Sequence, residues 1–294
     1  MGEDYIVRAT AADGAVRAFA ITSKELVEEA RLRHHTSATA TAALGRLLSA
    51  GAMMGSMMKG EQDMLTILIR SCGPLEGMTV TADSHGNVKG YCVVPSADPP
   101  LKNGKLDVGG ALGEGIMNVT RDLGMKEPYT GQIVLQTGEI AEDLTYYYAV
   151  SEQIPTSIGL GVLMNPNYTV RQAGGFIIQL MPDAGEEVIT LLEEKLAHTA
   201  SVTGMLECGL SPEDILDSFL GELGLVITDT LPAAFRCDCT REKVERAIRS
   251  LGEKDLSELV DLGKPVEARC DFCNTTYSFG VEEIKEILSS RRQS

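Results

Sequence analysis

The sequence contains no tryptophan, and its aromatic content is only 5%. A hydrophobic core must therefore rely on Val, Ile, Leu, Ala and Met. Hydrophobic residues still make up 44% of the 294 residues and charged residues 23%, which is close to an ordinary globular composition. This composition excludes disorder along the whole chain, because there is enough apolar material for a core. The length suggests about two domains.

Positive charge is also scarce. The chain has 26 Lys and Arg against 42 Asp and Glu, a net charge of −16. A general nucleic-acid binder needs positive charge to displace counterions from phosphates, and anionic membrane surfaces attract basic segments. We therefore expect no nucleic acid and no membrane among the partners. A P-loop and a G-x-G-x-x-G fingerprint are both missing, which excludes the usual nucleotide sites.

Long apolar runs and a secretory signal are missing as well. The chain begins with the letters MGED, where a signal peptide would have a basic end followed by an apolar run. The longest uncharged stretch, residues 153–170, contains Pro155 and Pro166 and cannot be a spanning helix. We expect a cytoplasmic protein. Seven cysteines in that compartment favour metal binding or thiol chemistry over structural disulfides.

Three compositional zones predict an α+β protein. Residues 1–182 are expected to form a mixed α/β domain with β-sheets packed against helices. Residues 183–234 are expected to form an acidic helical linker, and residues 235–294 a small C-terminal domain that holds four of the seven cysteines. Periodicity and turn signals in the first zone predict helices from Ser23 onward, over 38–58 and over 139–150. The same signals predict strands at 5–10, 15–21, 65–70, 78–83, 88–94, 131–136, 158–164 and 176–181.

The acidic zone is amphipathic and strongly charged. Residues 183–222 contain ten carboxylates and one lysine, a net charge of −9. Ser211 followed by Pro212 is typical of a helix start. Apolar side chains recur at helical spacing, so these helices should be stable only while that face is docked on other parts of the protein. An ordinary interdomain linker is the alternative interpretation. The recurring residues are Val188, Leu191, Leu192, Ile215, Leu216, Phe219 and Leu220.

The most informative motif is a C-x-C pair, Cys237 and Cys239, followed after 30 residues by a C-x-x-C pair, Cys270 and Cys273. Four thiolates can complete a tetrahedral zinc site. A domain this small has too little hydrophobic core to be stable without such a cross-link. Thr240 is placed to cap a helix that begins directly after Cys239 and ends at Gly252. Apolar spacing predicts a second short helix before Gly263 and a final helix after Cys273. The apolar residues of the three helices are Val244, Ala247, Ile248 and Leu251, then Leu256, Leu259 and Val260, then Val281, Ile284, Ile287 and Leu288. A purely structural zinc ribbon is the alternative, since most four-cysteine sites are structural.

The C-x-C pair favours a further hypothesis. Its sulfurs are close enough to oxidise to a small, strained and labile disulfide. Zinc binding is folding energy for so small a domain, so loss of the metal would unfold it. The motif is therefore compatible with a redox switch in which zinc holds the thiolates ready for an oxidant.

The cysteine spacing resembles that of the heat-shock protein 33 family, the redox-regulated bacterial 33 kDa chaperonins. Three upstream segments share the resemblance: residues 44–46 (LGR), residues 137–155, which begin TGEIAED, and residues 173–182 (AGGFIIQLMP). The resemblance implies a cytoplasmic, ATP-independent holdase that binds unfolding client proteins under oxidative stress and is not an enzyme. It also implies that the acidic zone is a metastable linker and that activation is accompanied by homodimerisation.

For the cysteines, the resemblance implies one Zn²⁺ per chain in the reduced state. Its ligands would be Cys237, Cys239, Cys270 and Cys273. Oxidation would pair Cys237 with Cys239 and Cys270 with Cys273, with release of the metal.

Two other functions stay open. A zinc-dependent thiol–disulfide enzyme would need an open metal position or a third catalytic group, and the sequence shows neither. A zinc-ribbon docking module for protein or nucleic acid is the second. Residues 237–294 carry 10 basic and 12 acidic side chains, which gives little affinity for phosphate.

Several isolated residues receive ordinary interpretations. Cys72 and Cys92 are expected to be buried as small hydrophobic residues, and Cys208 in the acidic zone has no assigned role. His34 and His35 are expected in a solvated loop. The glycines near residues 109 and 113 are interpreted as turns. A methionine cluster at 53, 54, 57 and 58 suits either a core helix face or an adaptable client surface, and the core is the default.

Overall fold

The computed structural model describes residues 3–198 and 200–291. The chain divides into two compact units, Met1–Arg236 and Cys237–Ser294. Each unit is described by itself. The α+β class predicted from the sequence is confirmed.

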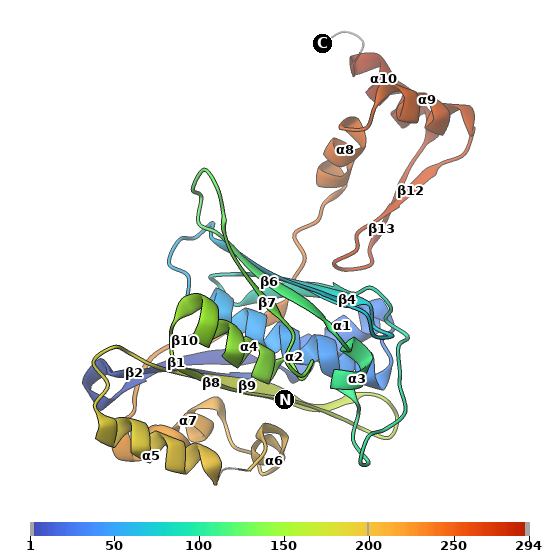
Figure 1. Ribbon diagram of the computed structural model, residues 1–294. Helices are drawn as coiled ribbons and strands as arrows, with labels where there is room; N and C mark the ends of the chain where they lie inside the picture. Colours follow the sequence, from blue (N-terminus) through green and yellow to red (C-terminus); the bar gives the residue numbers. More distant parts are fainter. Residues whose placement is uncertain (1–2, 199, 292–294) are drawn as a thin grey trace. The chain divides into compact units, whose positions relative to one another are not determined.

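The first unit contains two sheets (Figure 1). The first sheet is antiparallel and has the order β10-β1-β2-β9-β8, with β10 (Val226–Pro232), β1 (Tyr5–Ala11), β2 (Val16–Thr22), β9 (Val170–Leu180) and β8 (Thr156–Met164). The second has the order β11-β5-β4-β3-β6-β7, with β11 (Ala234–Phe235), β5 (Asn87–Cys92), β4 (Gly77–Asp83), β3 (Met64–Ser71), β6 (Gly115–Asp122) and β7 (Tyr129–Val134). Its pairs are antiparallel except β11 with β5.

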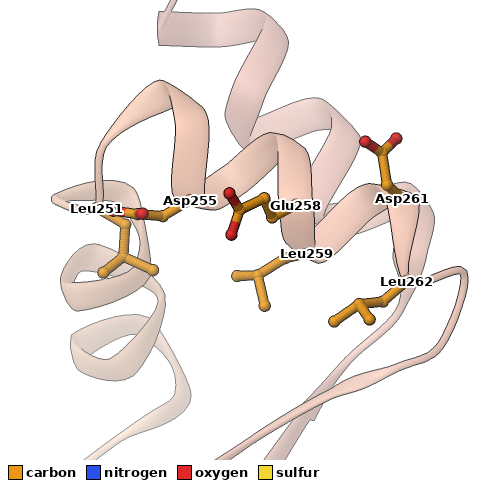
Figure 2. A pocket seen from close by; sticks show the side chains of 6 residues that line it. All are labelled: Leu251, Asp255, Glu258, Leu259, Asp261 and Leu262. Carbon is orange, nitrogen blue, oxygen red and sulfur yellow. The ribbon is translucent and has the colours of Figure 1, made fainter.

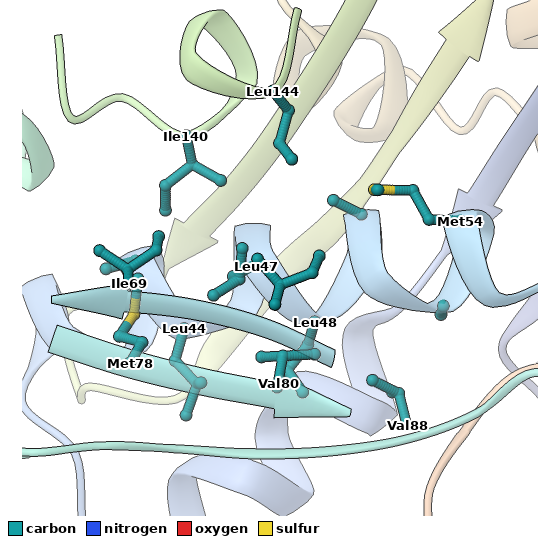
Figure 3. Packing of buried hydrophobic residues seen from close by; sticks show 14 of the residues in the cluster. Leu44, Leu47, Leu48, Met54, Ile69, Met78, Val80, Val88, Ile140 and Leu144 are labelled. Atoms are coloured by element: carbon teal, nitrogen blue, oxygen red, sulfur yellow. The ribbon is translucent and has the colours of Figure 1, made fainter. Parts of the chain in front are cut away.

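Helix α2 (Ala38–Gly55) packs against both sheets and forms the centre of the core (Figures 1 and 3). All but one of its residues are buried, as expected for a helix that is apolar on every side. Leu44, Leu47 and Leu48 belong to the same buried cluster as Met78 and Val80 of β4. The helix ends at Gly55, three residues before the predicted end at residue 58.

The remaining helices of this layer are α1 (Lys24–His34), α3 (Val108–Leu112) and α4 (Ala141–Tyr147), which continues into a π-helical turn, η2 (Tyr148–Glu152). A 3-10 turn, η1 (Ala12–Gly14), joins β1 to β2. Gly109 and Gly110 lie inside α3 rather than in a turn, because the Asp107 side chain accepts a hydrogen bond from the Gly110 amide and caps the helix.

Ser23 precedes α1 as predicted but does not cap it through its side chain. Its hydroxyl lies 2.7 Å from that of Ser49 in α2. The buried Asp4 carboxylate accepts a hydrogen bond of 2.7 Å from the Leu26 amide instead. The orphan donors at the start of α1 are thus satisfied partly by a residue from far away in the sequence.

The acidic zone forms α5 (Glu186–Ala197), α6 (Val202–Glu207), α7 (Pro212–Leu220) and the 3-10 turn η3 (Gly221–Leu223). These helices cover the face of the first sheet that is opposite to α2 (Figure 1). Residues 226–232 then form β10, a strand that the sequence analysis did not predict. β10 pairs with β1, so the chain enters the first sheet before β11 joins the second.

The second unit consists of α8 (Arg241–Arg249), α9 (Glu253–Asp261), the hairpin β12 (Val266–Arg269) and β13 (Thr276–Phe279), and α10 (Val281–Arg291). The three helices agree with the sequence prediction, and Thr240 caps α8 through a hydrogen bond from the Lys243 amide. The Arg241 guanidinium lies 4.3 Å from the centre of the Phe279 ring. The fully buried core is small and consists of Ile248, Leu256, Phe279, Ile284 and Ile287.

Within the described part of the chain, no helix has both the length and the apolar content that crossing a membrane requires.

Candidate metal centre

The second unit brings the four motif cysteines together. Their sulfur atoms all lie within 4.8 Å of one another. The sulfur–sulfur distance is 3.3 Å between Cys239 and Cys273 and 3.8 Å between Cys237 and Cys270. All four are free thiols. Cys273 is buried and the other three are half-buried, so the cluster is shielded but within reach of small molecules.

Two local structures position these sulfurs. Cys270 and Cys273 occupy the turn between β12 and β13, in which the Asn274 amide donates to the Cys270 carbonyl at 2.8 Å. Asn274 has a φ of 62°, a left-handed conformation that asparagine tolerates. Cys237 and Cys239 lie directly before α8, so the positive end of that helix points toward the cluster and favours thiolates.

Hydrogen bonds distinguish the four thiols. Burial raises the pKa of Cys237 and of Cys270. Burial also acts to raise the pKa of Cys273, but hydrogen bonds from Thr275 and from neighbouring thiols outweigh it and lower the pKa to about 7. Tyr277 donates to the Cys239 carbonyl at 3.1 Å, and its hydroxyl oxygen lies 3.2 Å from the Cys239 sulfur. The hydrogen bonds around Cys273 thus favour its thiolate, the form that binds metal.

The donor set suits a soft metal ion. Four sulfur atoms at these separations can surround one ion as a closed tetrahedral shell, in which no ligand position is left for substrate. The cluster can thus hold a metal ion, in a site of the structural type. Tyr277 and Thr275 are supporting residues that the sequence analysis missed, although both lie within four residues of Cys273.

A separate hollow of about 580 Å³ lies beside α9 in the same unit (Figure 2). No cysteine lines it, so it is not part of the metal centre. Its walls are three leucines and three carboxylates: Leu251, Leu259, Leu262, Asp255, Glu258 and Asp261.

The docked acidic segment is the second feature of interest, and it lies in the first unit. Phe219 of α7 is buried against Phe176 of β9, with ring centres 4.7 Å apart. Ser211 caps α7 by accepting from the Asp214 amide. Tyr5 of β1 donates to Glu213 at 2.8 Å, so α7 is also fastened to the sheet by a polar contact. The apolar face of these helices is docked, as the periodicity predicted.

The remaining cysteines and His34 differ in whether their burial matches the prediction. Cys92 is buried as predicted, and its burial raises the pKa of the thiol. Cys72 is exposed, contrary to the prediction, and it lies directly after the last residue of β3. Cys208 is exposed at the end of α6. His34 is buried rather than solvated, since its ring packs edge-on against Phe235 at 6.2 Å.

Comparisons with known proteins all match this chain to the same family. A family model described as Hsp33 protein matches residues 4–280. The 33 kDa chaperonin of Lachnoclostridium phytofermentans is 59% identical over 287 residues, 97% of this chain and 98% of that protein. That of Agathobacter rectalis is 58% identical over 285 residues, 97% and 99% of the two chains. The crystal structure of the 33 kDa chaperonin (heat shock protein 33 homolog) from Thermotoga maritima matches with a TM-score of 0.93 and 36% identity over all of both chains.

Proposed function

The chain belongs to the Hsp33 family of redox-regulated 33 kDa chaperonins, and from this premise we propose that its four-cysteine cluster is the switch of an ATP-independent holdase. The observation that carries the proposal is the assembly of Cys237, Cys239, Cys270 and Cys273 within 4.8 Å in a unit with a very small core. A chaperone of this family binds unfolding client proteins. We propose that it does so in the cytoplasm, under oxidative stress.

In the reduced protein, the four cysteines would hold one Zn²⁺ as thiolates. The bound ion would supply folding energy to the second unit. The chain contributes the arrangement: the β12–β13 turn presents Cys270 and Cys273, and the start of α8 presents Cys237 and Cys239. Lys243 is paired with Asp238, which keeps the carboxylate between the first two ligands neutralised.

Oxidation would form two disulfides, Cys237–Cys239 and Cys270–Cys273. Each bond forms as two thiolates lose two electrons to one molecule of hydrogen peroxide, which takes up two protons from the solvent and becomes two molecules of water, and Zn²⁺ would be released to the solvent as its ligands are lost. All four sulfurs lie within 4.8 Å of one another, so pairing within each motif and pairing between the motifs both start from short distances. A disulfide within either motif closes only a very short loop, so these two bonds can still form after the second unit has unfolded.

The acidic segment would transmit the switch. Its helices cover an apolar sheet face made by residues such as Val7, Ala18 and Phe176, and they carry a net charge of −9 over residues 183–222. Self-repulsion opposes the docked state. We propose that this zone acts as a metastable linker between the functional parts 1–182 and 235–294. Its release would expose apolar surface for clients and for homodimerisation.

The decisive experiment compares reduced and oxidised protein. Reduced protein should contain about one zinc per chain and should not suppress aggregation of a heat-unfolded client. After peroxide treatment at mildly unfolding temperature, zinc should be released and aggregation suppressed. Cys273→Ser should lose tight zinc, whereas Cys208→Ser and Cys72→Ser, which alter exposed thiols outside the cluster, should retain it. Equal activity of the reduced and oxidised wild type would contradict the switch.

A thiol–disulfide enzyme or a docking module would behave differently. Steady turnover of a small disulfide substrate by the reduced protein would favour the enzyme. Zinc retention through oxidation, with no change in client binding, would favour a docking module.

A further inference from the structure

A cavity of about 330 Å³ in the first unit has an unusual charge for this acidic chain. Arg17 of β2 contributes from the first sheet, Arg121 of β6 from the second, and Lys59 from the loop after α2. The carboxylates of its wall are Asp63 and Glu152. Three cations and two anions leave a net charge of +1 in a protein whose total is −16.

Both carboxylates are already engaged. Glu152 accepts from Arg121 at 2.9 Å and also from the Tyr147 hydroxyl. Asp63 accepts from the Gly60 amide at 2.8 Å. Among residues 3–198 and 200–291, no carboxylate forms an ion pair with Arg17 or with Lys59.

The Arg17 guanidinium is fixed through its Nε atom. Its Nε donates to the Gln179 side chain at 2.7 Å, and Gln179 is fully buried and in turn donates to Thr156 at 3.1 Å. Within the described residues, no carboxylate pairs with Arg17. Its two terminal nitrogens are thus oriented by a buried neighbour while they remain available, which is the arrangement that favours bidentate recognition of a carboxylate.

The rest of the wall is mostly apolar. Met54, Met57 and Met58 line it together with Leu123 and Ile154. Tyr148 donates its hydroxyl to the Met57 sulfur at 3.5 Å, and its ring is almost fully buried, so no open aromatic face is offered. Thioether side chains adapt to a flexible alkyl chain. A ligand with a second negative charge would be repelled by Asp63 and Glu152.

We propose that this cavity binds a small monocarboxylic acid with a flexible alkyl tail, of the medium-chain fatty-acid class. The carboxylate would bind the terminal nitrogens of Arg17, with Lys59 at the exposed side. The tail would lie against the methionines. A cavity of this size is in the range of small-molecule sites. This role is separate from the cysteine switch, and it gives Met54, Met57 and Met58 a function besides core packing.

The test is titration of the reduced full-length protein with octanoate, followed by calorimetry and ligand-observed NMR. Octanoate should bind, whereas octanol, which lacks the charge, and octylammonium, which reverses it, should bind at least about tenfold more weakly. Arg17→Gln should weaken octanoate binding at least about tenfold. Lys59→Glu alters an exposed loop residue and should weaken it without affecting folding. Arg70→Gln removes an exposed charge of β3 outside the cavity and should change nothing.

Circular dichroism and thermal melting of each variant separate loss of binding from loss of folding. If Arg17→Gln does not fold, Lys59→Glu carries the test. Undetectable octanoate binding to the wild type, equal binding by a folded Arg17→Gln or by Lys59→Glu, or equal affinity for octylammonium would each overturn the proposal.

Discussion

Replacement of Phe219 by alanine tests whether docking of the acidic helices keeps the chaperone inactive. Phe219 is 1% exposed and packs on Phe176 of β9. It belongs to the cluster between the helices and the outer sheet face, and not to the core around α2. The substitution therefore removes apolar contact mainly from the docked segment.

The magnitude follows from the size of the side chain. Truncation of a buried phenylalanine costs about 3–5 kcal/mol. If this cost falls on docking, the undocked population rises by about 10²- to 4 × 10³-fold, since each 1.4 kcal/mol is about tenfold. The ten carboxylates and one lysine of residues 183–222 already oppose docking through self-repulsion. Phe219→Ala should thus open residues 183–222 without oxidation.

Three measurements on the reduced variant check this expectation. Limited proteolysis should cut within residues 183–222, a dye for apolar surface should bind, and aggregation of a heat-unfolded client should be suppressed. Zinc should stay bound, because the second unit is unchanged.

The matched control is Phe19→Ala. Phe19 lies on β2 but faces the α2 core, and it is 4% exposed. At a temperature where both variants keep their secondary structure, Phe19→Ala should be neither cut in the acidic segment nor active. If Phe219→Ala opens the segment but does not protect the client, or if Phe19→Ala is equally active, docking is not what controls activity.

Three further changes give independent tests. Tyr277→Phe removes the hydroxyl that contacts the Cys239 sulfur and carbonyl, so zinc affinity measured by chelator competition should fall about tenfold or more; unchanged affinity would show that Tyr277 does not support the site. Asp4→Asn addresses pH: burial raises the pKa of Asp4 to about 6, so its protonated form stabilises the fold at low pH, and this contribution of up to about 3 kcal/mol is lost as pH rises from 4 through 6. The stability of Asp4→Asn relative to wild type should therefore rise over that window in chemical unfolding, and a constant difference would refute the assignment. Gly86 has a φ of +81°, and a Cβ at this position would lie 2.1 Å from the Pro232 carbonyl oxygen. Gly86→Ala should therefore loosen β10 and β11, which would appear as faster amide hydrogen exchange over residues 226–236. Unaltered exchange would show that the close contact of Gly86 with Pro232 does not hold these strands in place.

The local signals in the sequence were sufficient for much of the second unit. Thr240, Gly252 and the apolar spacing from Val244 to Leu288 predict three helices, and the structure has them at α8, α9 and α10. Helix starts and amphipathic faces depend on residues within four positions of one another, so they can be read without knowledge of the fold. The cysteine motif likewise identified the residues that come together in the cluster.

The sequence analysis missed features that depend on contacts between residues far apart in the chain. β10 has exposed residues at nearly every position, and it is a strand because β1 offers an edge. Asp4 caps α1 from outside the helix, and His34 is buried because Phe235, about 200 residues later, packs on it. Cys72 and Cys92 look alike in sequence, but one is exposed and the other is buried.

The sequence by itself thus determined the composition of the core, the helices of the second unit, the amphipathic acidic segment and the cysteine set, because each is encoded in residue type and short spacing. Only the tertiary structure decided where the acidic helices dock, which supporting groups surround the sulfurs, and that Arg17 and three methionines enclose one cavity. Those features depend on the register of strands and on contacts between distant segments, which short spacing does not specify.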